Sequence, residues 1–159
     1  MKLAEALKLR EVLNSETSRI DSKIRQSLIL QEGKTPLYNV DKKYDEFVAK
    51  TTELYRLAMS TNYTNNTVEI KDGTLCLTKA KTIGEVLIHR KFLKKKLELL
   101  EKIVEKGQEK DLESIDEIRF KSFVDIEVYD TKAEDVRKQI QELDTKLQEL
   151  TWEIDLIEI

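Results

Sequence analysis

The sequence has one cysteine, one proline, four glycines and one histidine among 159 residues, and each shortage excludes a class of protein. A single cysteine, Cys76, cannot form an internal disulfide, so the chain fits a reducing, cytoplasmic compartment. With only His89 and no glycine-rich phosphate loop, the usual metal sites, thiol–histidine pairs and nucleotide-hydrolysis motifs lack their parts. We therefore expect a protein that is not an enzyme and that needs no cofactor.

Long apolar runs and a strong excess of one charge are also missing. No stretch approaches the roughly 18 apolar residues of a membrane span, and the first residues lack the apolar core of a signal peptide. The net charge of −3 argues against wholesale binding to phosphate backbones or anionic lipids. A membrane is thus not an expected partner, and nucleic acid is disfavoured.

Charged and helix-forming residues are abundant. The composition is 37% charged and 6% aromatic, as is typical of long helices. Apolar residues near heptad spacing predict helices over about residues 2–30, 41–60, 83–106 and 130–158. We expect a mainly α fold in which four long helices form antiparallel coiled-coil-like hairpins, within a single helical domain over residues 1–159. The last helix has the clearest pattern, with Ala133, Val136, Ile140, Leu143, Leu147, Leu150, Ile154 and Ile157 three or four apart.

Several residues predict where helices begin and where strands interrupt them. Asp41 is a plausible N-cap of the second helix, and Thr82 forms a capping box with Glu85. The polar run from residue 60 to 67 predicts a loop, because such side chains favour turns. Alternating residues on both sides of an Asp-Gly pair predict a β-hairpin over about 67–78. A short strand over about 117–121 completes a small β-hairpin and sheet insertion.

Four long helices with few aromatic residues make a thin bundle, which has difficulty covering its own apolar stripes. Self-association into a homo-oligomer is the expected remedy. Trp152 lies off the stripe of the last helix, where it fills a subunit interface or stacks on a ligand; the interface is the favoured role.

Arg90 occupies a core position of the third helix, seven residues after Ile83 and seven before Leu97. A guanidinium placed there must meet an anion, because burying it unpaired costs several kcal/mol. Two partners stay open. One is a carboxylate from another helix, which the ordinary pairing of buried charges favours, and the other is a bound anionic ligand.

Other polar residues could complete a ligand site. Arg119 and Lys121 lie two apart on the predicted strand, so they project from one face as half of a phosphate clamp or simply as a solvated face. The polar run contributes amides and hydroxyls that either bind ligand or only lead the chain out of the helix. No catalytic residue or metal ligand is predicted. The candidate ligand-binding residues are Arg90, Arg119, Lys121, Asn62, Thr64 and Asn65.

Segments spread over nearly the whole chain carry a family resemblance: Met1-Lys2-Leu3-Ala4-Glu5-Ala6-Leu7, Gln31-Glu32-Gly33, Thr82 to Arg90, Glu117-Ile118-Arg119-Phe120 and Leu143-Asp144-Thr145 to Trp152. In these the chain resembles the septicolysin-like family of small, mostly helical bacterial and phage proteins of largely unknown function. Arg90-Lys91 departs from the basic-then-acidic pair expected in that family. The stretch before Glu117 also lacks its Tyr-Ser-Arg.

These observations predict a non-enzymatic homo-oligomer that binds a small anionic ligand between subunits, with a nucleotide or cyclic nucleotide as the leading candidate. A phage protein of this kind would counter host defence by sequestering the signal, which lowers the free ligand by mass action. The alternative is an interaction module with no small-molecule ligand, whose last helix docks partner or sister helices. A cryptic hydrolase is a third interpretation.

Overall fold

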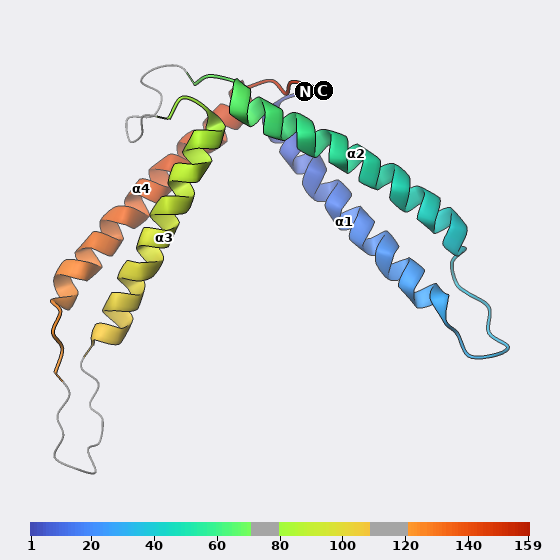
Figure 1. Cartoon of the computed structure of the whole chain (residues 1–159), viewed down its shortest axis with the longest axis horizontal. Coiled ribbons are helices and arrows are strands. Elements are labelled where there is room, and N and C mark those ends of the chain that lie inside the picture. The colour runs from blue at the N-terminus through green and yellow to red at the C-terminus, as the bar shows by residue number, and fades with distance from the viewer. Residues whose placement is uncertain (71–79, 109–120) are drawn as a thin grey trace, which may run out of the picture. The chain divides into compact units, whose positions relative to one another are not determined.

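The computed structural model describes residues 1–70, 80–108 and 121–159. They form four helices: α1 (Leu3–Leu28), α2 (Val40–Thr67), α3 (Ile83–Gly107) and α4 (Ile126–Glu153) (Figure 1). Beyond these helices, the pairing of extended backbone within the described ranges consists of two isolated β-bridges. The prediction of a mainly α protein is therefore confirmed.

The chain divides into two compact units. One comprises residues 1–68 and 148–159, which hold the α1–α2 hairpin, the end of α4 and the C-terminal tail, residues 154–159. The other comprises residues 69–147, in which α3 lies beside α4 (Figure 1). That the two units fold together as a single domain stays a prediction.

The core of the first unit is one apolar stripe between α1 and α2. Ala6, Leu13 and Leu57 form a buried cluster, and Leu9, Leu54 and Leu156 pack against it. The positions on α1 and α2 recur at the three- and four-residue spacing that places side chains on one face of a helix, and Leu156 comes from the tail. The stripe also contains a polar residue, Thr17, whose hydroxyl donates to the Asn14 carbonyl at 2.9 Å.

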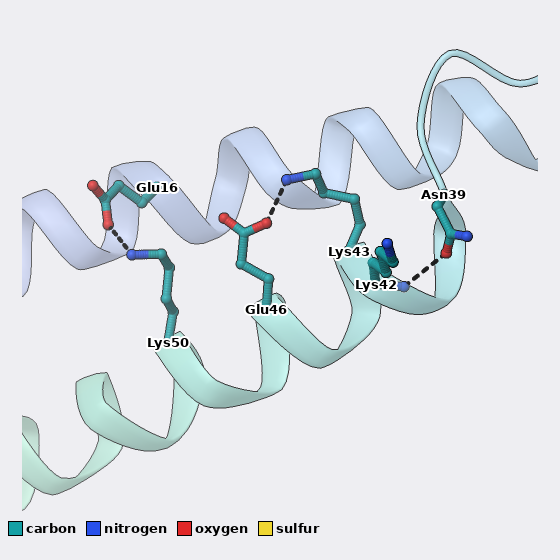
Figure 2. Close-up of polar contacts among 6 residues, drawn as sticks. All are labelled: Glu16, Asn39, Lys42, Lys43, Glu46 and Lys50. Atoms are coloured by element: carbon teal, nitrogen blue, oxygen red, sulfur yellow. Dashed lines mark hydrogen bonds and ion pairs between the residues drawn. The ribbon is translucent and has the colours of Figure 1, made fainter.

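Charged side chains of α1 and of the first half of α2 form ion pairs (Figure 2). Lys50 of α2 donates to Glu16 of α1 at 2.7 Å, which connects the two helices, and Lys43 pairs with Glu46 within α2. The bond to Glu16 raises the pKa of Lys50. Because the paired side chains are partly exposed, water screens them, so these ion pairs add less to stability than the apolar stripe does.

The second unit follows the same plan. Its buried residues are Ile83, Val86, Leu93 and Leu100 of α3 with Ala133, Val136, Leu143 and Leu147 of α4. The end of α3 comes very close to the start of α4. A Cβ atom at Gly107 would lie 2.7 Å from methyl groups of both Val124 and Ile126, so this position favours glycine.

The predicted start of α2 agrees with the structure to one residue, but its N-cap and its end differ from the prediction. The helix begins at Val40, and Asn39 is its N-cap, because the Asn39 side chain accepts a hydrogen bond from the Lys42 amide at 2.9 Å (Figure 2). At the other end, the predicted polar loop from residue 60 to 67 is helical. The hydroxyls of Thr61 and Thr64 bond to carbonyls four residues earlier, so these residues stay in the helix and are buried.

The last helix also differs from the prediction, because it covers residues 126–153 instead of about 130–158. The residues after Glu153, which were predicted to be helical, lie outside α4, and their backbone pairs with the start of the chain. The Leu3 amide donates to the Ile154 carbonyl and the Leu156 amide donates to the Met1 carbonyl, both at 2.9 Å. The apolar heptad pattern continues through residue 157, so it contained no sign of this change.

The predicted β insertion falls mostly outside the described residues. Thr67 belongs to α2, and residues 71–79 are not described. Antiparallel pairing does occur beside them, since Glu69 and Thr82 form a bridge and the Ile70 amide donates to the Lys81 carbonyl at 2.7 Å. The strand predicted over about 117–121 also lies outside the described residues except for Lys121, which is not in a strand.

The N-cap of α2 yields a first prediction. Asn39→Ala should lower the free energy of unfolding by about 1 kcal/mol, because the Lys42 amide loses its acceptor. Asn39→Ser, which keeps a capping oxygen, is the control and should stay close to the wild type. Urea unfolding followed by circular dichroism measures both variants, and equal stability of Asn39→Ala and wild type would contradict the assignment.

Candidate functional site

The structure divides the predicted ligand residues between the two units. Asn62, Thr64 and Asn65 belong to the first unit, and Arg90 and Lys121 belong to the second. Lys121 is exposed. Arg119 lies outside the described residues. The three residues of α2 also point to different sides of the helix, since Asn62 is exposed, Thr64 is buried and Asn65 is half-buried.

Arg90 is held by a carboxylate of its own chain. Its Nη2 donates to Oδ2 of Asp144 at 2.9 Å, and its Nε donates to Oδ1 of the same side chain. These hydrogen bonds raise the pKa of Arg90 and lower the pKa of Asp144. A two-pronged pair of this kind fixes orientation as well as charge. Of the two alternatives for Arg90, the internal carboxylate is the one that the structure contains.

Thr64 holds the C-terminal tail. Its hydroxyl accepts a hydrogen bond from the Ile157 amide at 2.9 Å while donating to the Ser60 carbonyl at 2.8 Å. The Ser60 hydroxyl in turn accepts from the Ile159 amide at 3.2 Å. Both hydroxyls are almost completely buried. Ser60 and Thr64 thus provide acceptors for backbone amides of the tail.

The amides of α2 have separate roles. Asn66 donates to both the side-chain oxygen and the carbonyl of Asn62, at 3.1 and 2.8 Å, on the exposed side of the helix. Asn65 lies on a different side, and its Oδ1 is buried without a hydrogen-bond donor among the described residues. Among the asparagines Asn62, Asn65 and Asn66, Asn65 is thus the one whose side chain has a buried polar atom without a partner in the described structure.

The two hairpins are versions of one pattern. Adding 80 to a residue number in α1 gives its counterpart in α3, and adding 86 to a number in α2 gives its counterpart in α4. The residues agree across the first pair of helices: Leu3, Glu5, Leu7, Arg10 and Leu13 correspond to Ile83, Glu85, Leu87, Arg90 and Leu93.

Backbone contacts follow the same correspondence. The bond from the Leu156 amide to the Met1 carbonyl has its counterpart in the bond from Ile70 to Lys81. The bridge between Lys2 and Asp155 likewise corresponds to the bridge between Thr82 and Glu69. Burial repeats too, since Leu57, Thr61 and Thr64 on α2 and their counterparts Leu143, Leu147 and Leu150 on α4 are all buried.

Arg10 is the residue at which this correspondence breaks chemically. It is the counterpart of Arg90, whereas the counterpart of Asp144 is Ala58. The methyl group of Ala58 cannot accept a hydrogen bond. The Nε of Arg10 is buried, and within the described ranges no acceptor contacts it. Arg10 is thus the candidate binding residue of the first unit.

The periodicity of α1 shows Arg10 only as an interruption of an apolar stripe. The signal that distinguishes it is the internal repeat, in which Lys2-Leu3-Ala4-Glu5-Ala6-Leu7 and Thr82-Ile83-Gly84-Glu85-Val86-Leu87 are each followed by an arginine three residues later. When the sequence of the first hairpin is aligned with that of the second, Arg10 corresponds to Arg90.

A small hollow lies where the tail covers the α1–α2 hairpin. It has a volume of about 70 Å³, and Leu9, Leu57, Ser60 and Leu156 contribute to its lining. Arg56 and Glu158 pair at 3.6 Å on the same lining. Ligand pockets for small molecules usually have volumes of about 300–1,000 Å³, so this hollow is too small to enclose a nucleotide.

Among residues 1–70, 80–108 and 121–159, no group of three or more His, Cys, Asp or Glu side chains is arranged to hold a metal ion. Of the four helices that the structure describes, none combines the length and the apolar character that crossing a bilayer requires.

The tail contact yields a second prediction. Thr64→Val should lower the free energy of unfolding by about 1 kcal/mol and speed hydrogen exchange at the Ile157 amide, because that amide loses its acceptor. Thr145→Val is the matched control, since Thr145 makes a similar bond to the carbonyl four residues earlier but is exposed. Unchanged exchange at Ile157 in Thr64→Val would show that this bond does not hold the tail.

The pairing of Arg90 yields a third prediction. The pKa of Asp144 lies below its ordinary value of 3.8 in the folded protein, so the pair stabilises the fold at higher pH. That contribution should decline as the pH falls below the ordinary pKa and through the folded one. Asp144→Asn should therefore lose stability relative to wild type at neutral pH, and the difference should shrink in acid. A difference that does not change between pH 7 and pH 2 would contradict the ion pair.

Comparisons with known proteins match nearly the whole chain. The model of a family described as a family of unknown function (DUF6847) matches residues 10–156. No curated protein matches the chain. The chain is similar to the crystal structure of a functionally unknown conserved protein from Corynebacterium diphtheriae, with 27% sequence identity, a TM-score of 0.88 and coverage of 99% of both chains. Since the family model covers well over half of its residues, the chain belongs to the DUF6847 family.

Proposed function

We propose that this protein is a non-enzymatic homo-oligomer that works by binding, and that its copies associate through an apolar face of α2. The observation that supports this proposal is a row of exposed apolar and aromatic side chains on that helix. This row, the outer stripe, consists of Tyr44, Val48, Tyr55, Met59 and Tyr63, whose exposed fractions are 60%, 43%, 66%, 42% and 47%.

The outer stripe lies away from the core. At about 100° per residue its five members fall within one third of the helix circumference. Leu57 and Thr64, which are buried, fall on the opposite side. The helix is thus apolar on two faces, and only one of them packs within the hairpin. Exposed apolar rows of this kind mark protein interaction surfaces, and tyrosine is enriched there.

The counterpart positions on α4 show that an apolar outer face is not needed for the hairpin fold. Adding 86 to the numbers of the outer stripe gives only polar residues: Asp130, Glu134, Gln141, Thr145 and Glu149. Both hairpins fold on the same plan, so the tyrosines and Val48 serve something other than folding of the hairpin. Association of α2 with α2 of a second copy around a two-fold axis satisfies this requirement, since such axes are the commonest in homo-oligomers.

The same face also fits a helix from another protein, which is the interaction-module alternative. A second copy is the stronger proposal because the outer stripe provides a self-complementary row of tyrosines and aliphatic side chains. α3 has a comparable set in the second unit, where Ile88, Phe92 and Leu99 are 72%, 62% and 61% exposed. Trp152, 56% exposed, is also available to an interface.

Sequestration of a nucleotide or cyclic nucleotide is a second candidate function. Arg90, which motivated it, is engaged by Asp144, so the observation that now favours it is the buried Nε of Arg10, which has no acceptor within the described ranges. A role in phage counter-defence and the resemblance to septicolysin-like proteins belong to this candidate. The single cysteine is compatible with a cytoplasmic location for either function.

The outer stripe yields a fourth prediction. Tyr55→Glu should shift the protein from an oligomer to a monomer, because a carboxylate in the middle of a paired apolar stripe loses its hydration without gaining a partner. Gln141→Glu, the same change at the counterpart position of α4, should leave assembly unchanged.

Size-exclusion chromatography with light scattering measures the mass of both variants, and circular dichroism confirms that each stays helical. The same oligomeric mass for wild type and Tyr55→Glu would show that the outer stripe is not the interface. A monomeric wild type that binds nucleotide in calorimetry would instead favour the second candidate.

A further inference from the structure

We infer that Arg10 binds an oxyanion, either a carboxylate or a phosphate, that comes from outside its own hairpin. The inference deepens the second candidate function and rests on it, but it does not require the outer stripe to be an interface. It follows from comparing two halves of one chain in which the same arginine has two different environments.

Arg90 shows what an arginine at this position of the hairpin does. It lies four positions after Val86 and three before Leu93, both buried, and so faces α4 from the edge of the apolar stripe. From there its Nε and Nη2 both reach the carboxylate of Asp144. The position therefore presents a guanidinium fork to a planar oxyanion.

Arg10 occupies the same position in the first hairpin. Ala6 and Leu13, the counterparts of Val86 and Leu93, are buried in the same way. Arg10 and Arg90 are both half-buried, and so are Ala58 and Asp144. Backbone hydrogen bonds at the starts of α1 and α3 also correspond. The two arginines thus have the same local setting except for the loss of the carboxylate.

No other carboxylate takes its place among the residues described. The salt bridges of the first unit occupy Lys2, Arg25, Lys43, Lys50 and Arg56, and Arg10 forms none within the described ranges. Its Nε is nevertheless buried, so water does not satisfy it freely. A buried donor with a full positive charge calls for a charged acceptor.

Asn65 provides a second unsatisfied polar atom on the same side of α2. It follows Ala58 by seven residues, two helical turns, so the two residues share one face of the helix. Its Oδ1 is buried and has no donor within the described part of the chain. The counterpart of Asn65 in α4 is Thr151, whose hydroxyl donates to the Gln148 carbonyl at 2.8 Å and is thereby satisfied. The two buried atoms that lack partners in the described part of the chain therefore both lie in the hairpin without the internal carboxylate.

The test exchanges the environments of the two arginines. Inorganic phosphate is titrated into the full chain while the Nε–Hε resonances of its arginines are followed by NMR, with Arg10→Lys identifying the Arg10 signal. In the wild type the Arg10 signal should shift saturably and the Arg90 signal should not. Ala58→Asp, which restores the missing carboxylate, should abolish the response of Arg10. Asp144→Ala, which removes the carboxylate from the other hairpin, should make Arg90 respond.

Ala58→Asn is the control for added bulk without charge, and it should keep the response of Arg10. If Ala58→Asp fails to fold, the response of Arg90 in Asp144→Ala still tests the inference. A second arm dilutes the protein without phosphate: a shift of the Arg10 signal on dilution would identify the oxyanion as a carboxylate of a second copy.

The inference is overturned if the Arg10 signal responds neither to phosphate nor to dilution, or if Ala58→Asp leaves its response unchanged. These outcomes are separate from those for the proposed interface. The mass of the Tyr55→Glu variant tests the interface, and the Arg10 signal tests the oxyanion site.

Discussion

Removal of one apolar stripe from water between two paired helices is the interaction on which each unit depends. Leu13 and Leu57 in the first hairpin, and Leu93 and Leu143 in the second, are almost completely buried, while charged residues alternate along the outside. A pair of helices has only one shared face, so every other apolar side chain stays in water unless another surface covers it. The outer stripe of α2 departs from a polar exterior, and it motivates the proposal of self-association.

The internal repeat makes the polar departures from this plan interpretable, because each hairpin serves as the reference for the other. Where α4 has leucines at 147 and 150, α2 has buried threonines, and Thr64 holds the C-terminal tail. Where α4 has Asp144, α2 has Ala58, and an arginine is left without its carboxylate. The first difference is explained within the chain. The second is the observation on which the proposed oxyanion site rests.

Much of the fold could be predicted from the sequence, since heptad spacing and the capping box at Thr82 locate α1 and α3 to within a few residues. The end of α2 could not be predicted, because hydroxyl-rich residues favour loops unless distant backbone needs them, and the tail that bonds to Thr64 is 93 residues away. For Arg90 the need for an anion was evident but the identity of the anion was not. Arg10 could be identified as a candidate binding residue only through the internal repeat. The periodicity of α1 alone shows it just as an interruption of the apolar stripe.

We expect that a hairpin with two apolar faces does not remain alone in water. Sedimentation equilibrium of the unmodified protein over a wide range of concentrations tests this claim most directly, because it yields mass without reference to shape. We expect an integral multiple of the 18.6 kDa chain mass, with dissociation only at the lowest concentrations. A mass of one chain throughout the range would contradict it.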